Sequence, residues 1–217
     1  MNKKNNLINV FYLLVPGFIL LISFTHIPAV KTLMNSFYST AKGRRASKFV
    51  GLENYETLWQ DATFWKVFSN NIIYALGVIP SSILLSLGMA LWVNSKIIGR
   101  PFLRFSYFLP TVLPLIAVRN FWLFFYAPGF GLIDQIVTSL GFPSLNILGS
   151  QESSLFGVMA VGIWKEAGFY MIFYLAGLQA IPPDLKEAAM IEGANKWYIF
   201  WRITFPLLTP TTLFVSV

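Results

Sequence analysis

Six residues with polar, charged or aromatic side chains lie in otherwise apolar stretches of the chain. They are Arg119, Asn120, Trp164, Lys165, Glu166 and Tyr170. If these stretches cross a membrane, each ionisable side chain there calls for a functional hypothesis, because charge is costly in a bilayer. Together the six could line a polar path or bind a hydroxyl-rich ligand. The alternative is that Arg119 and Lys165 extend to the membrane interface and anchor their helices.

A second group of residues marks a short polar segment, 182–205. Pro182 and Pro183 end the apolar stretch before it, because proline blocks helix continuation. Asp184 and Glu187 have the spacing of a capping box, and Gly193 suits the position just after a helix end. The sequence therefore predicts a short helix that ends at Gly193.

This helix has features of a docking element. Ala188 and Ala189 would leave a bare face that a partner could approach closely, and Leu185, Met190 and Ile191 would add apolar contacts. Residues 194–202 then place aromatic rings and cations where a membrane interface would suit them. An ordinary interfacial loop is the alternative on these residues alone.

The sequence contains few of the residue patterns that enzymes use for catalysis. His26 is the only histidine and the chain has no cysteine, so a metal cluster or a serine–histidine couple is not predicted. The P-loop pattern GxxxxGK[ST] is absent, so the chain does not cradle ATP phosphates in that way. We expect no catalytic residue, no metal and no cofactor on this chain. Another polypeptide would supply energy for any energy-dependent work.

The composition indicates whether these residues belong to a water-soluble domain or to a membrane protein. Of 217 residues, 56% are hydrophobic and only 12% are charged, whereas a soluble domain carries roughly 25% charged residues. The net charge of +7 sits on a chain too apolar to bind nucleic acid in a groove. The sequence predicts an integral membrane protein in a lipid bilayer.

Long uncharged segments predict an all-α, polytopic transmembrane helix bundle. A spanning helix needs about 20 predominantly apolar residues. We expect one transmembrane domain over 1–217, with spans near 9–29, 68–93, 104–126, 155–179 and 206–217. The last of these is only part of a span, so we expect the domain to be incomplete at its C-terminal end, by natural truncation or because the chain is a fragment.

Orientation and packing follow from simple patterns. More lysines and arginines fall in loops on the N-terminal side of the membrane than on the other, which predicts an N-terminus inside, although the Lys42–Lys48 cluster disagrees. Ser82, Ser86, Ala90 and Asn94 form a stripe of small residues that favours close helix packing. Three prolines could kink spans: Pro80, Pro110 and Pro114.

The segment 182–205 also carries a family resemblance. The run Glu187-Ala-Ala-x-x-x-Gly193, followed after nine residues by Ile203-x-Phe-Pro206, resembles the EAA loop of ABC-importer permease subunits. More narrowly, the chain resembles permeases of binding-protein-dependent sugar uptake, the maltose and glycerol-3-phosphate type. Glu192 and Phe205 stand where that family usually has Asp and Leu.

The resemblance implies a mechanism. The short helix would be a coupling helix seated in a cytoplasmic ATP-binding subunit, which would carry ATP and magnesium. Its coupling residues would be Asp184, Glu187, Ala188, Ala189, Met190, Gly193 and Pro206.

The resemblance also implies further partners and a location. A second permease subunit would share the path, and an extracytoplasmic solute-binding protein would meet the loops at 42–55 and 127–152. The location implied is the bacterial cytoplasmic membrane, and the solute implied is a sugar. Two alternatives stay open: the same mechanism with a polyol or glycerol phosphate, or a channel or structural protein with no ATPase partner.

Overall fold

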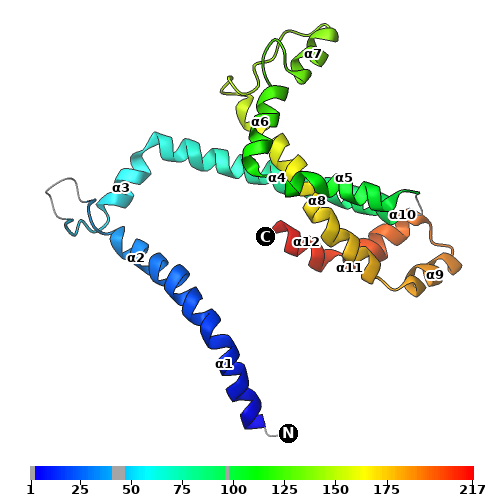
Figure 1. The fold of residues 1–217 in the computed structure, drawn as a ribbon, viewed down its shortest axis with the longest axis horizontal. Helices are drawn as coiled ribbons and strands as arrows, with labels where there is room; N and C mark the ends of the chain where they lie inside the picture. The colour runs from blue at the N-terminus through cyan, green and yellow to red at the C-terminus, as the bar shows by residue number, and fades with distance from the viewer. Residues whose placement is uncertain (1–2, 41–46, 96–97) are drawn as a thin grey trace. The chain divides into compact units, whose positions relative to one another are not determined.

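The computed structural model describes residues 3–40, 47–95 and 98–217, with side chains from Phe11 onward. Residues 42–46 of the predicted outer loop, including most of the Lys42–Lys48 cluster, lie outside the described residues. Over the described ranges the regular secondary structure is helical apart from one isolated bridge between Tyr38 and Phe49, and turns and irregular segments join the helices. The predicted all-α class is therefore confirmed (Figure 1).

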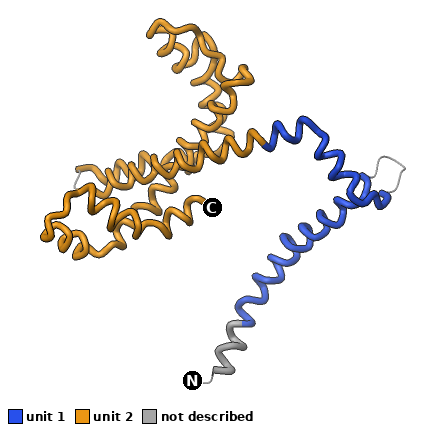
Figure 2. The backbone as a smooth tube through the Cα atoms, turned by 180° about the vertical axis from the view of Figure 1, so that it is seen from behind, with its two compact units in different colours: residues 1–68 blue, residues 69–217 orange. Residues whose placement is uncertain are grey.

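The chain divides into two compact units, residues 1–68 and 69–217 (Figure 2). In the first, α1 (Lys3–Leu21), the π-helix η1 (Ile22–His26) and α2 (Ile27–Asn35) follow without a break. Asn54 of α3 (Glu53–Gln60) then donates hydrogen bonds to the carbonyls of Ser36 and Tyr38 at 2.7 and 3.0 Å. These bonds tie the start of α3 to the end of α2.

Two long helices run through the second unit. They are α4 (Ala62–Asn94), which begins in the first unit, and α8 (Ser154–Ala180), which contacts α5 and α12. The other elements of this unit are α5 (Arg100–Val112), α6 (Leu115–Phe125), α7 (Leu132–Ser139), α9 (Pro183–Ile191), α10 (Lys196–Ile199), the π-helix η2 (Phe200–Thr204), α11 (Phe205–Leu207) and α12 (Thr209–Ser216).

Three helices in the described residues are long and apolar enough to cross a membrane: Phe11–Asn35, Ala62–Asn94 and Ser154–Ala180. The segment predicted as a third span, 104–126, differs from a straight helix because α5 and α6 meet at a bend of 98°. The cause is Pro114, since Leu113 before it adopts an extended conformation with ψ of 133°. Pro80 and Pro110 lie inside α4 and α5 without ending them.

The core of the second unit forms where α4, α8 and the C-terminal helices pack together. Met171 and Tyr174 of α8 are fully buried, as are Ala90 of α4 and Leu208. Ser82 and Ser86 are also buried, so the predicted stripe of small residues faces the helix packing as expected. The Tyr174 hydroxyl donates to Thr212 Oγ1 at 3.0 Å, which joins α8 to α12.

Helices α5 and α8 lie close together at Gly168. A Cβ atom at that position would overlap the backbone carbonyl oxygen of Tyr107 in α5. The carbonyl belongs to the backbone, so no rotamer change could remove the overlap. The absence of a side chain at Gly168 therefore sets the distance between these two helices.

Candidate functional site

The short helix predicted between two apolar segments is α9, Pro183–Ile191. Its start differs from the prediction, because Pro182 is the N-cap residue and no side chain caps the helix. Pro183 occupies the first helical position, for which its fixed φ suits it. Asp184 therefore lies inside the first turn and cannot form the predicted capping box with Glu187. Its carboxylate instead suits the positive end of the helix dipole.

The end of α9 matches the prediction closely. Gly193 has φ of +84°, a conformation that favours glycine. Its N–H donates to the Met190 carbonyl at 3.1 Å, and the Ala194 N–H donates to the Ala189 carbonyl at 2.9 Å. This pair of bonds is a Schellman motif, which fixes the helix end and the direction in which the chain leaves it.

Three apolar side chains of α9 are exposed, and at about 100° per residue they leave the helix in different directions. Ile191 is 88% exposed, Met190 55% and Leu185 45%. The prediction of a bare face with two alanines needs correction: Ala188 is exposed, but Ala189 is buried against the chain itself. The surface that α9 offers a partner therefore rests on Leu185, Met190 and Ile191, with Ala188 beside them.

The segment after Gly193 returns the chain to the apolar helices. Asn195 caps α10 by accepting the Tyr198 N–H at 2.8 Å, a signal that the sequence reading missed. Trp197 is 71% exposed, and the Arg202 guanidinium lies 6.0 Å from the centre of the Tyr198 ring. Exposed aromatic rings beside a cation suit a membrane interface. Pro206 then lies in α11, in its first turn.

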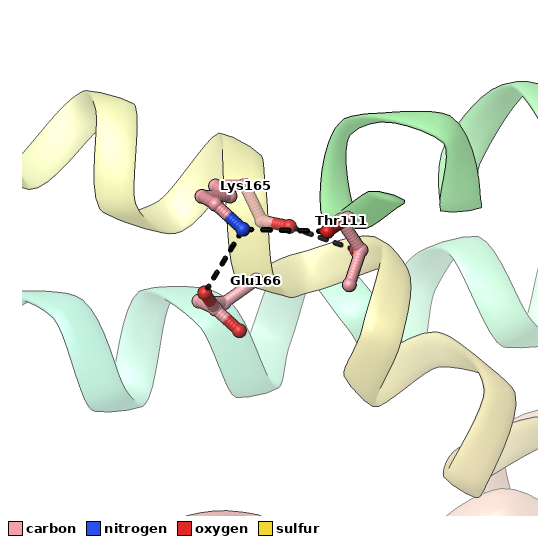
Figure 3. A network of polar contacts seen from close by, with 3 residues as sticks. All are labelled: Thr111, Lys165 and Glu166. Carbon is pink, nitrogen blue, oxygen red and sulfur yellow. Dashed lines mark hydrogen bonds and ion pairs between the residues drawn. The ribbon is translucent and has the colours of Figure 1, made fainter. Parts of the chain in front are cut away.

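Lys165, one of the six predicted path residues, makes a structural contact (Figure 3). Its Nζ donates to the Thr111 carbonyl at 3.4 Å, and the Thr111 hydroxyl donates to the Lys165 carbonyl at 3.0 Å. Because α5 ends at Val112, the last carbonyls of that helix lack partners within it. Lys165 supplies a donor and a positive charge where the helix dipole favours one. Glu166 Oε1 lies 3.9 Å from the same Nζ.

Replacing Lys165 with Met should test this positioning role. The variant keeps the length of the side chain but leaves the Thr111 carbonyl without its donor, at a cost of about 1 kcal/mol. We expect the thermal midpoint of the purified transporter to fall by a few degrees while the KM for solute stays unchanged. A raised KM with an unchanged midpoint would instead place Lys165 in the path.

The other path candidates fall into separate environments. The Trp164 ring stacks on that of Phe121 of α6, with 6.3 Å between the ring centroids, and contacts the Trp122 ring edge-on, with 5.4 Å between the centroids. Trp164 therefore belongs to an aromatic cluster. Arg119 and Asn120 on α6 are exposed, and Arg119 borders an apolar cavity of about 270 Å³. Tyr170 is half-buried one turn after Glu166 on α8. The six residues do not form one cluster.

A buried carboxylate that the sequence reading missed organises the loop on both sides of α7. Asp134 is 3% exposed and accepts three hydrogen bonds: from the Leu145 N–H at 2.7 Å, the Ser144 hydroxyl at 2.8 Å and the Gly129 N–H at 2.8 Å. The hydrogen bond from the Leu145 N–H contributes most to lowering the pKa of Asp134, and the bonds from Ser144 and Gly129 lower it further. Desolvation by burial acts in the opposite direction and raises the pKa. The charged carboxylate is thus the form that this loop requires.

Asp134→Asn should loosen the loop. An amide nitrogen would replace one acceptor oxygen and face a donor, so we expect hydrogen exchange at the Gly129 and Leu145 amides to accelerate by roughly tenfold. Because the folded pKa is lowered, the stabilisation is present above the unfolded value of about 3.9 and is lost as the pH falls through the lower, folded value. The parent should therefore lose protection below about pH 4, and the variant should show no such transition. Equal exchange in both proteins would contradict this role.

Comparisons with known proteins place these features in a family. Residues 82–217 match the family described as the inner membrane component of binding-protein-dependent transport systems. The chain is 35% identical over 207 residues to the osmoprotective compounds uptake permease GgtC of Synechocystis, covering 93% of this chain and 72% of that protein. It is 33% identical to the sn-glycerol-3-phosphate permease UgpA of Agrobacterium fabrum, covering 95% of this chain and 70% of that protein.

A solved structure shares the fold. A chain of a bacterial ABC transporter that imports the acidic polysaccharide alginate aligns with a TM-score of 0.76 and 25% identity, covering 95% of this chain and 70% of that one. Within the described residues, no group of three His, Asp or Glu side chains could hold a metal ion. The chain belongs to the family of binding-protein-dependent transport system inner membrane components, and is a membrane-spanning permease subunit of an ATP-binding-cassette importer rather than an enzyme.

Proposed function

We propose that this permease carries a sugar, with a polyol or glycerol phosphate as the alternative solute. Similar permeases are named for trehalose and maltose, for sulfoquinovosyl glycerol and for sn-glycerol-3-phosphate. All of these solutes are rich in hydroxyl or other oxygen groups. The solute of this chain is therefore expected to need hydrogen-bonding groups along its path.

On α8 we assign the path to the face that carries Glu166 and Tyr170. These residues are one turn apart, so their side chains leave the helix on the same side. The Glu166 side chain is 40% exposed and Tyr170 is half-buried, which leaves a carboxylate and a hydroxyl available to a solute. Lys165 then acts by holding the end of α5 in place.

We further propose that α9 is the coupling helix. It is a short helix between two apolar helical segments, its apolar residues face outward, and the Schellman motif at Gly193 fixes its end. A helix held rigidly in this way can transmit movement of a partner to the membrane-spanning helices as a rigid body. The single observation that carries this proposal is the exposure of Leu185, Met190 and Ile191 around α9, which a soluble partner that encloses the helix could cover.

The proposal assigns partners to each side of the membrane. Cytoplasmic subunits that bind ATP and magnesium would cover α9. With four spans before α9, the N-terminus would lie on the same, inner side. A second permease subunit would complete the path. An extracytoplasmic solute-binding protein would contact the loops at 42–55 and 127–152, and a similar alginate transporter has been solved with a periplasmic protein bound.

A crosslinking experiment tests the coupling helix. The chain has no cysteine, so Met190→Cys can carry a photo-crosslinker without background from its own thiols. In native membranes we expect mass spectrometry to identify an ATP-binding subunit as the captured protein. Adding Gly193→Pro should abolish capture, because proline cannot adopt a φ of +84°.

The matched control is Leu140→Cys, which is 69% exposed just after α7. It should label equally well without capturing the ATP-binding subunit. If Met190→Cys is labelled efficiently but captures only lipid or neighbouring membrane helices, α9 is not the coupling helix.

A further inference from the structure

An apolar groove runs between α6 and the first turns of α8, and we call it the α6–α8 groove. Its volume is about 270 Å³. The side chains that form its apolar walls are Leu115, Val118, Leu123, Leu148, Val158 and Val161. The groove lies wholly in the second unit of the chain, and no residue assigned to coupling lines it.

Arg119 borders this groove and has no anionic partner among the described residues. It is exposed, and no described residue forms an ion pair or a hydrogen bond with it. Trp122 also lines the groove, and its indole nitrogen is buried without a hydrogen-bond acceptor in the part of the chain that the structure describes. The buried Trp122 nitrogen has no accessible surface, so the exposed Arg119 guanidinium is the donor that an occupant of the groove could reach.

The walls of the groove exclude a sugar as its occupant. A sugar buried there would leave most of its hydroxyl groups against leucine and valine side chains, and an unpaired buried hydroxyl is costly. A hydrocarbon chain suits the same walls because it needs no hydrogen bonds. The chemistry that fits the whole groove is an apolar chain joined to an anionic group that accepts hydrogen bonds.

The position of the groove along α8 agrees with this chemistry. With 27 residues, α8 is about 40 Å long, whereas the hydrocarbon core of a bilayer is about 30 Å thick. Val158 and Val161 follow Ser154 by four and seven residues, which is about 6–10 Å from the start of the helix. The groove is therefore near the level at which lipid headgroups meet acyl chains.

We propose that the α6–α8 groove binds an anionic phospholipid. An acyl chain would fill the apolar cavity, and the phosphate would accept hydrogen bonds from the Arg119 guanidinium. Arg119 is then a lipid-binding residue and not part of the solute path.

The test uses the complete transporter, reconstituted in nanodiscs that contain a photoactivatable lipid. Two lipids with the same diazirine-bearing acyl chain are compared, phosphatidylglycerol and phosphatidylcholine. With the parent protein, we expect phosphatidylglycerol to label peptides of α6 and the start of α8 about tenfold more than phosphatidylcholine. Arg119→Gln should reduce labelling by phosphatidylglycerol to the phosphatidylcholine level, and Arg119→Lys should retain most of it.

Two further variants distinguish binding in the apolar cavity from a general attraction of the anionic lipid to cations. Val161→Trp should fill the cavity and reduce labelling although Arg119 is unchanged. Lys31→Gln, which removes an exposed cation near the end of another apolar helix, should leave labelling at the groove as in the parent. Equal elution volumes and thermal midpoints would show that the variants are folded.

Two results would overturn the proposal. One is labelling at the groove that is equal for both lipids and insensitive to Arg119→Gln. The other is capture of the second permease subunit by a photo-crosslinker placed at Leu123, because a protein would then cover the groove in the assembled transporter.

Discussion

Gly168→Ala should lower the thermal midpoint of the purified transporter by roughly 5–10 °C, which corresponds to about 3 kcal/mol. The new methyl group would overlap the Tyr107 carbonyl oxygen, so α5 and α8 would have to move apart. That movement would also stretch the bonds between Thr111 and Lys165, which join the same two helices. The cost is therefore at the upper end of the overpacking range.

Gly88→Ala is the matched control for this prediction. Gly88 also lies in an apolar helix, α4, but a Cβ there would meet nothing within 4 Å. Alanine favours helix over glycine by about 1 kcal/mol, so this variant should be at least as stable as the parent. Fluorescence-detected size exclusion after heating would compare the two. Equal midpoints for Gly168→Ala and the parent would show that α5 and α8 are not held at the distance described.

Features that depend on local sequence were predicted well. Uncharged segments predicted the apolar helices, since crossing a bilayer requires a continuous apolar stretch. The spacing of Ser82, Ser86, Ala90 and Asn94 predicted which side of α4 would pack against other helices. The first three are buried and Asn94 is half-buried. Gly193 predicted the end of α9 because a positive φ is a property of one residue and its immediate neighbours.

Features that depend on distant contacts were not predicted. Asp134 is buried because Gly129, Ser144 and Leu145 supply donors, and neither the loop path nor those donors can be read from spacing. The contact of the Lys165 side chain with the end of α5 was not predicted either, and that end exists because of the bend at Pro114.

The start of α9 shows a competition between two local signals. Asp184 and Glu187 had the spacing of a capping box, yet Pro183 took the first helical position and moved the N-cap to Pro182. Ala189 shows a different limit, because its burial depends on how α9 lies against the rest of the chain. Spacing alone could not distinguish it from the exposed Ala188.

Met190→Lys should separate the permease from its ATP-binding subunit while leaving the permease folded. Met190 is 55% exposed in the last turn of α9, where a lysine suits the helix dipole, so the helix itself should not be destabilised. If an ATP-binding subunit covers this side of α9, the ammonium group would be buried without a partner. A buried unpaired charge costs about 3 kcal/mol or more, which would weaken the association by about a hundredfold.

The measurements are co-purification of the ATP-binding subunit and solute uptake into vesicles, and both should fall together. Met190→Leu keeps the volume and the apolar character, so it should behave as the parent does. Leu140→Lys introduces the same charge at a site of similar exposure beside α7, and should leave co-purification intact. If the ATP-binding subunit still co-purifies with Met190→Lys and uptake persists, the exposed side of α9 does not contact it. A lysine at the centre of an interface is tolerated only if its ammonium group stays in water, because a buried unpaired charge is costly. The contact between the two subunits would then lie elsewhere on the permease.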